Sequence, residues 1–375
     1  MVVNPLLQKI AALIRKNGPI TFEEFMSLAL YDPEFGYYHT EPRKIGREGD
    51  FYTSSHLHPV FGAIIGRQIK EMWDVMGRPD DFSIVEIGAG AGYVCKDMLE
   101  SLRHTVFFPS VHYTIVERSP AMKNIQQRLL AEFPDRVKWV CALNECGSLA
   151  GCIFSNELLD AFPVHLVRME DTLKEIYLEF DDENGLMELT GDLSSEEIAY
   201  YFREFSIEIG KGYTTEVNLR IKPWLRDINE VLEKGFILTI DYGYPAWDYY
   251  SEDRNRGTIL CYHKHQLHET PYVNIGEQDI TAHVNYSSVK KWGEEIGIKT
   301  AGYCGQGAFM VSLGIDEDMK KIAESSHDFQ FEIARIKKMI LPQGMGESHK
   351  VMVQYKGVKP PKLRGFSIRN QIKIL

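Results

Sequence analysis

The sequence predicts an α/β fold in which a mostly parallel sheet is covered by helices. Two observations support this: short apolar strands alternate with helical runs from residue 82 onward, and a glycine-rich turn follows the first strand. The strand is expected at Phe82 to Ile87, and Gly92 opens a helix that runs through Leu102. A strand, a glycine turn and a helix in this order form a cradle for a nucleotide-type ligand, because residues without Cβ atoms allow a tight bend and a close approach.

The glycine spacing distinguishes two kinds of cofactor. The turn has the spacing Gly88-x-Gly90-x-Gly92, whereas the dinucleotide fingerprint G-x-G-x-x-G would require glycine at the position of Tyr93. With Glu86 two residues before the first glycine, the turn resembles the first motif of class I S-adenosylmethionine (SAM) methyltransferases. A glycine-rich turn that binds nothing is the alternative, because short motifs often match by chance.

A second strand, Val111 to Glu117, ends in a carboxylate and is followed by a helical run from Ser119 to Phe133. Adjacent parallel strands end at the same edge of a sheet, so Glu117 is expected beside the glycine turn. A carboxylate there can accept both hydroxyl protons of a ribose. A solvated glutamate at a turn is the alternative. The predicted nucleoside-binding residues on these two strands are Glu86, Gly88, Gly90, Gly92 and Glu117.

Polar residues also follow the fourth predicted strand, which runs from Gly151 to Glu157. Asn156, Glu157 and Asp160 are expected at the reaction centre, because ligands of open α/β sheets bind beyond the carboxyl ends of the strands. Asn156 is assigned to the cofactor and the two carboxylates to catalysis. Helix capping by Asn156, with Asp160 in solvent, is the alternative.

A polar loop from Gly46 to Ser55 precedes a predicted helix from Pro59 to Met76. Its residues Asp50, Thr53 and Ser54 are expected to close over the cofactor as a lid, because loops on a rigid scaffold commonly carry ligand contacts. A segment that only caps the helix is the alternative.

The composition limits the class of partner and the cell compartment that are expected for this protein. The chain is 44% hydrophobic and 25% charged, as is usual for soluble globular proteins. A formal net charge of −11 argues against nucleic acid as a partner and suits a cationic substrate. Six cysteines without a C-x-x-C pair indicate a reduced, cytoplasmic setting. The start of the chain lacks the layout of a signal or transit peptide, and no apolar run reaches the ~18 residues of a membrane span.

Two further expectations concern metals and assembly. The group Cys261, His263, His265 and His268 has a spacing that matches no structural zinc pattern, so no metal site is expected. Monomer and homodimer both remain open.

The chain divides into three predicted parts. Residues 1–80 form a helical extension with the lid loop, residues 81–356 the sheet domain, and residues 357–375 a basic tail. The sheet domain carries insertions near 164–215, with hairpin strands, and near 244–286. The tail is expected to be an arm or a frayed end, because termini that are not tied down usually are. One long helical stretch is expected at 316–339 and a closing strand at 349–355.

Motifs along residues 5–356 together resemble the MidA family of class I SAM-dependent methyltransferases. In chain order they are Gly49-Asp-Phe, Glu86-Ile-Gly-Ala-Gly, Asn156-Glu-Leu-Leu-Asp-Ala-Phe-Pro, Ile240-Asp-Tyr-Gly, Arg256-Gly-Thr, Gln278-Asp-Ile-Thr-Ala-His-Val and Gly344-Met-Gly-Glu. The resemblance implies SAM as the cofactor and a seven-stranded Rossmann-like sheet with a helical N-terminal extension. Mitochondrial members of that family are implicated in arginine methylation of a respiratory complex I subunit during assembly.

The sequence departs from the family pattern at two places. Asn285-Tyr286 stands where Asp-Phe is usual, which bears on a carboxylate role beside His283. His349 stands where Phe is usual, and this change is expected to affect packing only.

Methyl transfer from a sulfonium is an in-line displacement, so the protein mainly has to position the acceptor and exclude water. A guanidinium acceptor is cationic, and carboxylates are the groups that hold it. With the resemblance, this predicts a protein arginine as substrate, held by Glu157 and Asp160. Further candidates are Glu216 and Asp241. His283 is either a proton acceptor or a residue that holds a loop.

Three alternatives remain at this stage. A nicotinamide-dependent oxidoreductase is disfavoured by Tyr93 and by the Asn156-Glu157 pair. A SAM-binding assembly protein with little catalysis and a methyltransferase acting on another acceptor both fit the same motifs.

Overall fold

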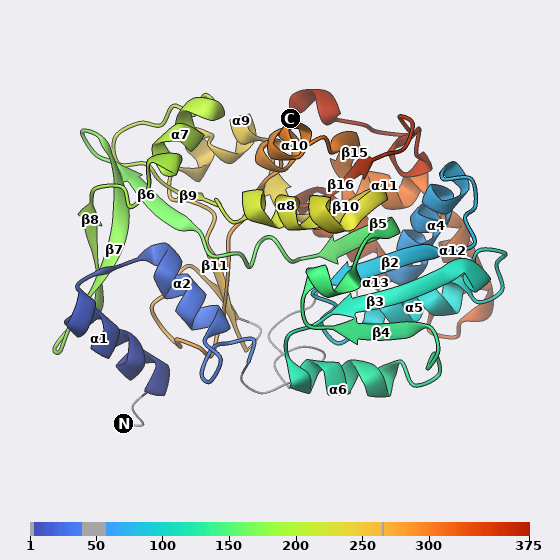
Figure 1. Cartoon of the computed structure of the whole chain (residues 1–375), viewed down its shortest axis with the longest axis horizontal. Helices are drawn as coiled ribbons and strands as arrows, with labels where there is room; N and C mark the ends of the chain where they lie inside the picture. Colours follow the sequence, from blue (N-terminus) through green and yellow to red (C-terminus); the bar gives the residue numbers. More distant parts are fainter. Residues whose placement is uncertain (1–3, 40–57, 265) are drawn as a thin grey trace.

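In the computed structural model, which describes residues 4–39, 58–264 and 266–375, a large twisted sheet lies beside a smaller body of strands and helices (Figure 1). The strands that run across the large sheet are, in order, β15 (Lys299–Gly305), β16 (His349–Lys356), β10 (Leu232–Tyr244), β5 (Leu149–Asn156), β2 (Phe82–Ile87), β3 (Val111–Val116) and β4 (Val137–Val140). β16 runs antiparallel to both of its neighbours, and β10, β5, β2, β3 and β4 are parallel. A short strand, β14 (Val284–Asn285), extends the pairing of β10. This confirms the predicted α/β class with a Rossmann-like sheet.

Helices cover both faces of this sheet, because its central strands are apolar on both sides. Ile84 of β2 belongs to the core under one layer, and the next residue, Val85, belongs to the core under the other. The first layer contains α4 (Val60–Val75), α5 (Tyr93–Leu102), α6 (Pro120–Leu129), α11 (Gln306–Ser312), α12 (Ile315–Ser325), α13 (Phe329–Ile340) and α14 (Met345–Ser348). The second layer contains α8 (Ile221–Val231) and α10 (Tyr286–Glu295). The single helix expected at 316–339 is therefore two helices, α12 and α13.

Helix α4 belongs to the sheet body, although the predicted boundary at residue 80 had placed it in the N-terminal extension. It crosses α5 closely at Gly62, where a Cβ atom would lie 2.7 Å from Asp97 Cβ. Its apolar stripe, with Ile64 and Ile65 fully buried, packs into the same core as β2. The stripe was visible in the sequence, but the partner that covers it was not.

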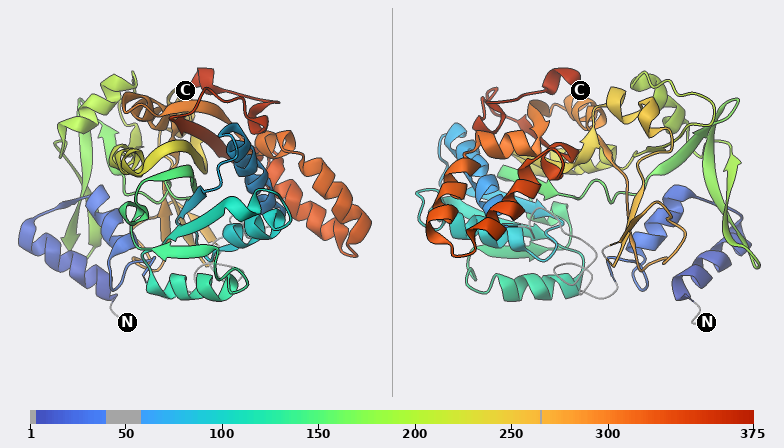
Figure 2. Two further views of the ribbon diagram at one scale, coloured as in Figure 1. Left: turned by 45° about the vertical axis from the view of Figure 1, so that its right-hand side comes forward. Right: turned by 180° about the vertical axis from the view of Figure 1, so that it is seen from behind.

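The smaller body joins the N-terminal helices to both predicted insertions (Figure 2). Its buried core takes Phe25 from the N-terminus, Ile176 from the first insertion and Ile280 from the second. Its helices are α1 (Pro5–Asn17) and α2 (Phe22–Tyr31), with α7 (Glu196–Glu204) and α9 (Ala246–Tyr249) between it and the large sheet. Its strands are β1 (Ile20–Thr21), β6 (His165–Met169), β7 (Leu173–Asp181), β8 (Gly185–Gly191), β9 (Thr214–Val217), β11 (Leu260–His263), β12 (Gln266–His268) and β13 (Asp279–Thr281).

The C-terminal residues are docked on the sheet body, so the expected arm or frayed end is wrong. Phe366, in the short 3-10 helix Arg364–Phe366, is buried against Gly302, where an added Cβ would lie 2.2 Å from the ring. Gly365 N–H donates to Gln68 Oε1 at 3.1 Å, and Gln371 N–H donates to Tyr303 O at 2.7 Å. The segment is rich in basic residues, so its few apolar residues that anchor it to the sheet body could not be recognised from the sequence.

Candidate active site

The glycine turn adopts a backbone that side chains disfavour. Gly88, Gly90 and Gly92 have φ values of 73°, 52° and 90°, in the left-handed region where a Cβ atom is penalised. Gly92 is the N-cap of α5, so the free N–H groups of the first helical turn face the open edge of the sheet. The turn thus offers backbone donors and close approach to a ligand.

Glu86 lies beneath this turn and not at its open side. Its carboxylate is 2% exposed and accepts a hydrogen bond from Tyr113 Oη at 2.7 Å. Burial raises the pKa of Glu86 to about 7. The side chain does not reach the open edge, so any effect of Glu86 on a cofactor acts through the turn.

Glu117 follows β3 beside the turn, as predicted, and a residue that sequence reasoning missed holds it there. Gln126 of α6 is fully buried, and its Nε2 donates to Glu117 Oε2 at 2.9 Å and to Gly90 O at 2.8 Å. Trp139 Nε1 donates to Gln126 Oε1 at 2.9 Å, which fixes the orientation of the amide. Burial raises the pKa of Glu117. A polar residue among the apolar positions of α6 was the available signal in the sequence.

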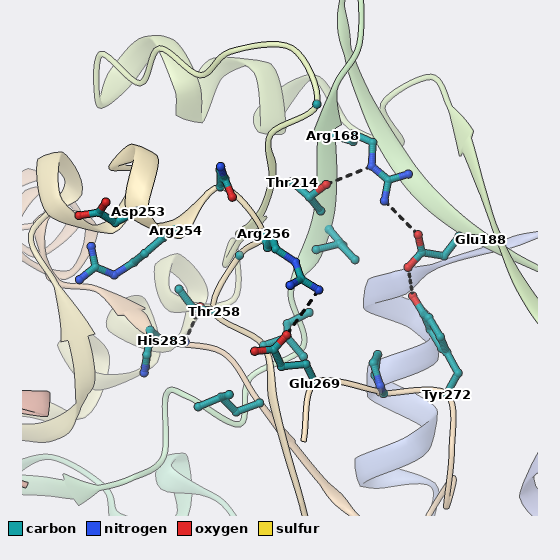
Figure 3. A pocket seen from close by; sticks show the side chains of 17 residues that line it. Arg168, Glu188, Thr214, Asp253, Arg254, Arg256, Thr258, Glu269, Tyr272 and His283 are labelled. Atoms are coloured by element: carbon teal, nitrogen blue, oxygen red, sulfur yellow. Dashed lines mark hydrogen bonds and ion pairs between the residues drawn. The ribbon is translucent and has the colours of Figure 1, made fainter. Parts of the chain in front are cut away.

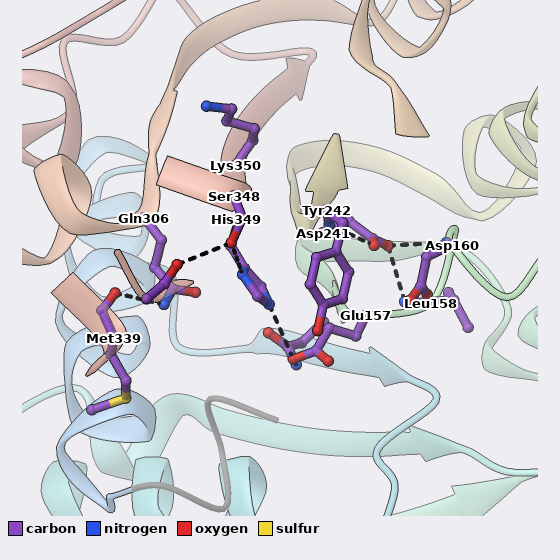
Figure 4. Close-up of polar contacts among 12 residues, drawn as sticks. Glu157, Leu158, Asp160, Asp241, Tyr242, Gln306, Met339, Ser348, His349 and Lys350 are labelled. Carbon is purple, nitrogen blue, oxygen red and sulfur yellow. Dashed lines mark hydrogen bonds and ion pairs between the residues drawn. The ribbon is translucent and has the colours of Figure 1, made fainter. Parts of the chain in front are cut away.

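Asn156 and Glu157 lie where β5 ends (Figure 4). Glu157 has φ 50°, uncommon for a residue with a side chain, and its N–H donates to Ile240 O at 2.8 Å. Asn156 Nδ2 donates to Glu157 Oε1 at 3.2 Å, so the two predicted residues do lie together. Asn156 Oδ1 is buried and has no hydrogen-bond partner among the described residues. An unpaired buried acceptor is costly, so this oxygen fits a ligand donor.

Asp241 is not available to a substrate, which contradicts its place among the carboxylate candidates. It is fully buried, and its Oδ2 accepts from the N–H groups of Leu158 and Leu159 at 3.1 and 2.8 Å. Its Oδ1 accepts from Tyr242 N–H at 2.8 Å. Asp241 therefore holds the turn that carries Glu157 in place.

Glu157, Asp160 and Asp241 together form an acidic region, in which Asp160 is 4% exposed. Burial, together with the charge of Asp241, raises the pKa of Asp160 well above its ordinary value. Because several N–H donors favour the ionised form of Asp241, the proton that this pair retains resides on Asp160. The arrival of a cation would favour the ionised form of Asp160 as well.

Glu216 is likewise excluded as a ligand for a guanidinium. It is 1% exposed, and its Oε1 accepts from the N–H groups of Thr258 and Ile259 at 2.7 and 3.2 Å. Its Oε2 accepts from Tyr249 Oη at 3.0 Å and from Thr258 Oγ1 at 3.1 Å. Both carboxylate oxygens are therefore occupied by hydrogen bonds from within the fold.

His283 lines a pocket of about 510 Å³ next to the acidic region (Figure 3). The centroid of the Tyr242 ring lies 5.9 Å from that of the His283 ring and 4.1 Å from that of the His349 ring. Burial, assisted by Arg254 and His349, lowers the pKa of His283 to about 4. His283 is thus neutral at pH 7, and its Nδ1 is buried without a partner among the described residues. The same pocket is also lined by Arg254, Arg256, Thr258 and Glu269 (Figure 3).

His349 does more than pack, contrary to the expectation for this departure from the family. Tyr242 and His349 are paired across β10 and β16, which brings the imidazole toward the end of β5 (Figure 4). His349 Nε2 lies 3.7 Å from Glu157 Oε1. The other departure, Asn285, caps α10 by accepting from Ser287 N–H at 3.0 Å, and its Nδ2 donates to Tyr201 Oη at 2.7 Å.

The predicted lid residues Asp50, Thr53 and Ser54 lie outside the described residues, so the lid stays a prediction. Within the described ranges, no group of three or more His, Cys, Asp or Glu side chains is placed to hold a metal ion. His263 Nδ1 instead contacts Glu277 O at 2.9 Å, and Cys261 is buried in the smaller body.

Comparisons with known proteins agree with this geometry. The model of the family described as "Putative S-adenosyl-L-methionine-dependent methyltransferase" matches residues 64–304, more than half of the chain. A crystal structure of a Burkholderia thailandensis protein, described as a "likely methyl transferase" and bound to S-adenosyl-homocysteine, superposes with a TM-score of 0.90 at 30% identity; the match covers 99% of this chain and 96% of that one.

Curated relatives match along most of the chain. The mitochondrial protein named protein arginine methyltransferase NDUFAF7 homolog from Drosophila melanogaster is 26% identical, over 97% of this chain and 87% of that protein. The human protein named protein arginine methyltransferase NDUFAF7 is 24% identical, over 87% of this chain and 77% of that protein. The fold, the glycine turn with its carboxylate and these matches together place the chain in the family of S-adenosyl-L-methionine-dependent methyltransferases, and SAM is its cofactor.

Proposed function

We propose that this methyltransferase acts on an arginine side chain of a protein, and that Glu157 is the principal ligand of the guanidinium. The supporting observation is the way Glu157 is held. A left-handed backbone aims it from the carboxyl end of β5, and Asn156 orients Oε1. Oε2 accepts from no donor among the described residues. The names of the curated relatives point to the same substrate class.

The residues present fit the cofactor. The glycine turn permits close approach, Glu117 offers acceptors for a ribose, and the unpaired Asn156 Oδ1 suits an ammonium group. When bound, SAM supplies a methyl group on a sulfonium. The residues of the chain orient the acceptor for in-line attack and offset its charge.

Asp160 supports Glu157 in this proposal. Both carboxylates belong to the turn that Asp241 holds through backbone N–H groups, so their relative position is fixed before substrate arrives. A guanidinium that contacts Glu157 brings a positive charge toward Asp160, which stabilises the ionised form of that buried carboxyl. The acidic region therefore selects a cation.

Glu157→Gln tests the proposal, because it keeps the shape and removes the charge. We expect methyl transfer to an arginine-containing peptide to fall at least ~10-fold, since losing a charged hydrogen bond costs about 1.5–3 kcal/mol. SAM affinity, measured by calorimetry, should stay within about 2-fold. Glu183→Gln, in an exposed hairpin turn, is the matched control.

The labelled residue is then identified by mass spectrometry of the wild-type product. Transfer by Glu157→Gln at the wild-type rate would show that the carboxylate does not hold the substrate. Label on lysine, a carboxyl group or a small molecule would refute arginine and leave the methyltransferase assignment intact.

We also propose a cytoplasmic location. All six cysteines are free in the structure, which suits a reducing compartment. No helix among the described residues has the length and apolar character that crossing a bilayer requires. The curated relatives are named as mitochondrial proteins, so cell fractionation with an antibody against this chain is the direct test; recovery in an organelle fraction would refute the proposal.

A further inference from the structure

We propose that His349 is a positioning residue for Glu157, and that through Glu157 it takes up the proton which the acceptor releases on methylation. The inference rests on the proposed function, because it concerns the same carboxylate. It assigns a task to a buried histidine that the proposed function leaves unused.

The first observation is the contact itself. His349 Nε2 lies 3.7 Å from Glu157 Oε1, and the two side chains are 1% and 8% exposed. Nε2 is buried and has no hydrogen-bond partner among the described residues. A buried imidazole nitrogen without a partner is costly unless it gains one, and the only acidic oxygen within ion-pair distance of it in the described part of the chain is Glu157 Oε1. A shift of a few tenths of an ångström would bring the pair to hydrogen-bond distance.

The second observation is how the ring is held. The Tyr242 ring covers one face of the imidazole, with centroids 4.1 Å apart and planes 47° apart. On the other ring nitrogen, His349 Nδ1 lies 3.1 Å from Ser348 Oγ (Figure 4). The ring therefore has little freedom to turn, and Nε2 stays aimed at Glu157.

The third observation is that Ser348 supports either tautomer of the ring. Its Oγ also lies 3.3 Å from Gly344 O, and a hydroxyl has only one hydrogen to donate. If Ser348 donates to Gly344 O, it accepts from Nδ1–H, and Nε2 then carries no hydrogen. If it donates to Nδ1, Nε2 carries the hydrogen toward Glu157. Nε2 can thus gain or lose a proton without movement of the ring.

This geometry allows the proton that is released on methylation to move through Glu157 to His349. A guanidinium nitrogen forms a bond to the methyl carbon as the carbon–sulfur bond breaks, and the electron pair of that bond stays on sulfur. The methylated nitrogen sheds one proton to Glu157, and Glu157 passes it to His349 Nε2. Product release returns the proton to water and restores the starting state.

Other charged or titratable groups surround the ring and bear on its protonation. Tyr242 faces it from β10 and His283 lies near it from the segment before β14, while Lys350 and Glu347 belong to its own strand and the preceding helix. His283 adds no positive charge at neutral pH, because burial lowers its pKa to about 4. Lys350 pairs with Glu347 at 3.6 Å. Glu157 is the acidic group that contacts Nε2.

The first test compares pH–rate profiles of methyl transfer for wild type, His349→Phe and His349→Gln. We expect kcat at pH 7 to fall at least ~10-fold in both variants, as for the loss of a group that moves a proton. KM for SAM should change less than about 2-fold. The acid limb of the profile should also change in both variants, because the imidazole no longer exchanges a proton with Glu157.

His112→Gln is the matched control. His112 also pairs with a carboxylate, Asp81 at 2.9 Å, but lies at the opposite end of β3 from the site. Variants with kcat and acid limb unchanged from wild type would overturn the inference. If only His349→Phe is impaired and His349→Gln restores the full rate and profile, His349 orients Glu157 without taking a proton, and the uptake step is wrong.

A second test does not depend on the substrate. Ring ¹⁵N shifts of selectively labelled histidine report which nitrogen of His349 carries a proton. We expect the Nε2 shift at pH 7 to differ between wild type and Glu157→Gln, because the group that faces Nε2 changes from a carboxylate to an amide. Unchanged shifts would refute the coupling. Failure of wild type to methylate arginine would refute the proposed function alone, and this measurement would still decide the His349–Glu157 contact.

Discussion

Gln126 Nε2 donates to Glu117 Oε2 at 2.9 Å, and the same nitrogen donates to Gly90 O at 2.8 Å. One buried amide therefore joins the glycine turn to the carboxylate of the next strand. The turn and Glu117 are the predicted nucleoside-binding parts, and Gln126 holds the two at a fixed spacing without belonging to either motif.

Gln126→Leu should therefore weaken SAM binding. The variant fills the space but removes a charged hydrogen bond, a loss of about 1.5–3 kcal/mol, or roughly 10- to 100-fold in affinity. Calorimetric titration with SAM measures it. Gln127→Leu, one residue along the same helix and exposed, is the control. Wild-type affinity in a folded Gln126→Leu protein would contradict this account.

Glu86 predicts a pH dependence of stability. Its pKa is raised from 4.5 to about 7 in the fold because burial disfavours the ionised carboxylate. The folded state therefore binds the proton more tightly than the unfolded state. The stability this contributes is fully present below pH 4.5 and is lost as the pH rises to about 7, by on the order of 3 kcal/mol.

Glu86→Gln cannot titrate, so this loss should disappear. We expect the free energy of unfolding of the variant, relative to wild type, to be larger at pH 8 than at pH 5. Denaturant unfolding at the two pH values measures the difference. If the two proteins lose or gain stability in parallel between these pH values, Glu86 is ionised throughout, and burial does not govern it.

The sequence predicted those parts of the site that short-range geometry determines. The strand, the turn and the helix around Gly88 follow from local backbone requirements, and all three glycines of the turn take positive φ. Glu117 fell in the right place because parallel strands in register end at one edge. Turn residues and strand periodicity of this kind can be recognised in a single sequence.

What escaped prediction depends on contacts between distant segments. Asp241 and Glu216 are further candidates for substrate ligands in the sequence, but backbone N–H donors about eighty and forty residues away occupy their acceptor oxygens. The contact of His349 with Glu157 is not visible in the sequence, because its register opposite Tyr242 is set by the pairing of distant strands. The docked C-terminus was missed for the same reason: its anchor Phe366 is recognisable only beside Gly302.

Glu216 provides a test that separates a structural carboxylate from Glu157, the proposed substrate ligand. Four donors surround it: two backbone N–H groups and the hydroxyls of Tyr249 and Thr258. Glu216→Gln replaces one acceptor oxygen with an NH₂ group that faces donors, so at least one buried hydrogen bond is lost. We expect a loss of about 1.5–3 kcal/mol in the free energy of unfolding.

Methyl transfer per folded molecule should stay near the wild-type value in Glu216→Gln, in contrast to Glu157→Gln. Thermal unfolding gives the first quantity, and activity at low temperature, normalised to the folded fraction, gives the second. Glu179→Gln, exposed on β7 of the same small sheet, controls for the change of charge. A Glu216→Gln protein that is as stable as wild type but inactive would mean that this carboxylate reaches the substrate, because a group enclosed by four protein donors cannot lose its charge without a cost to the fold.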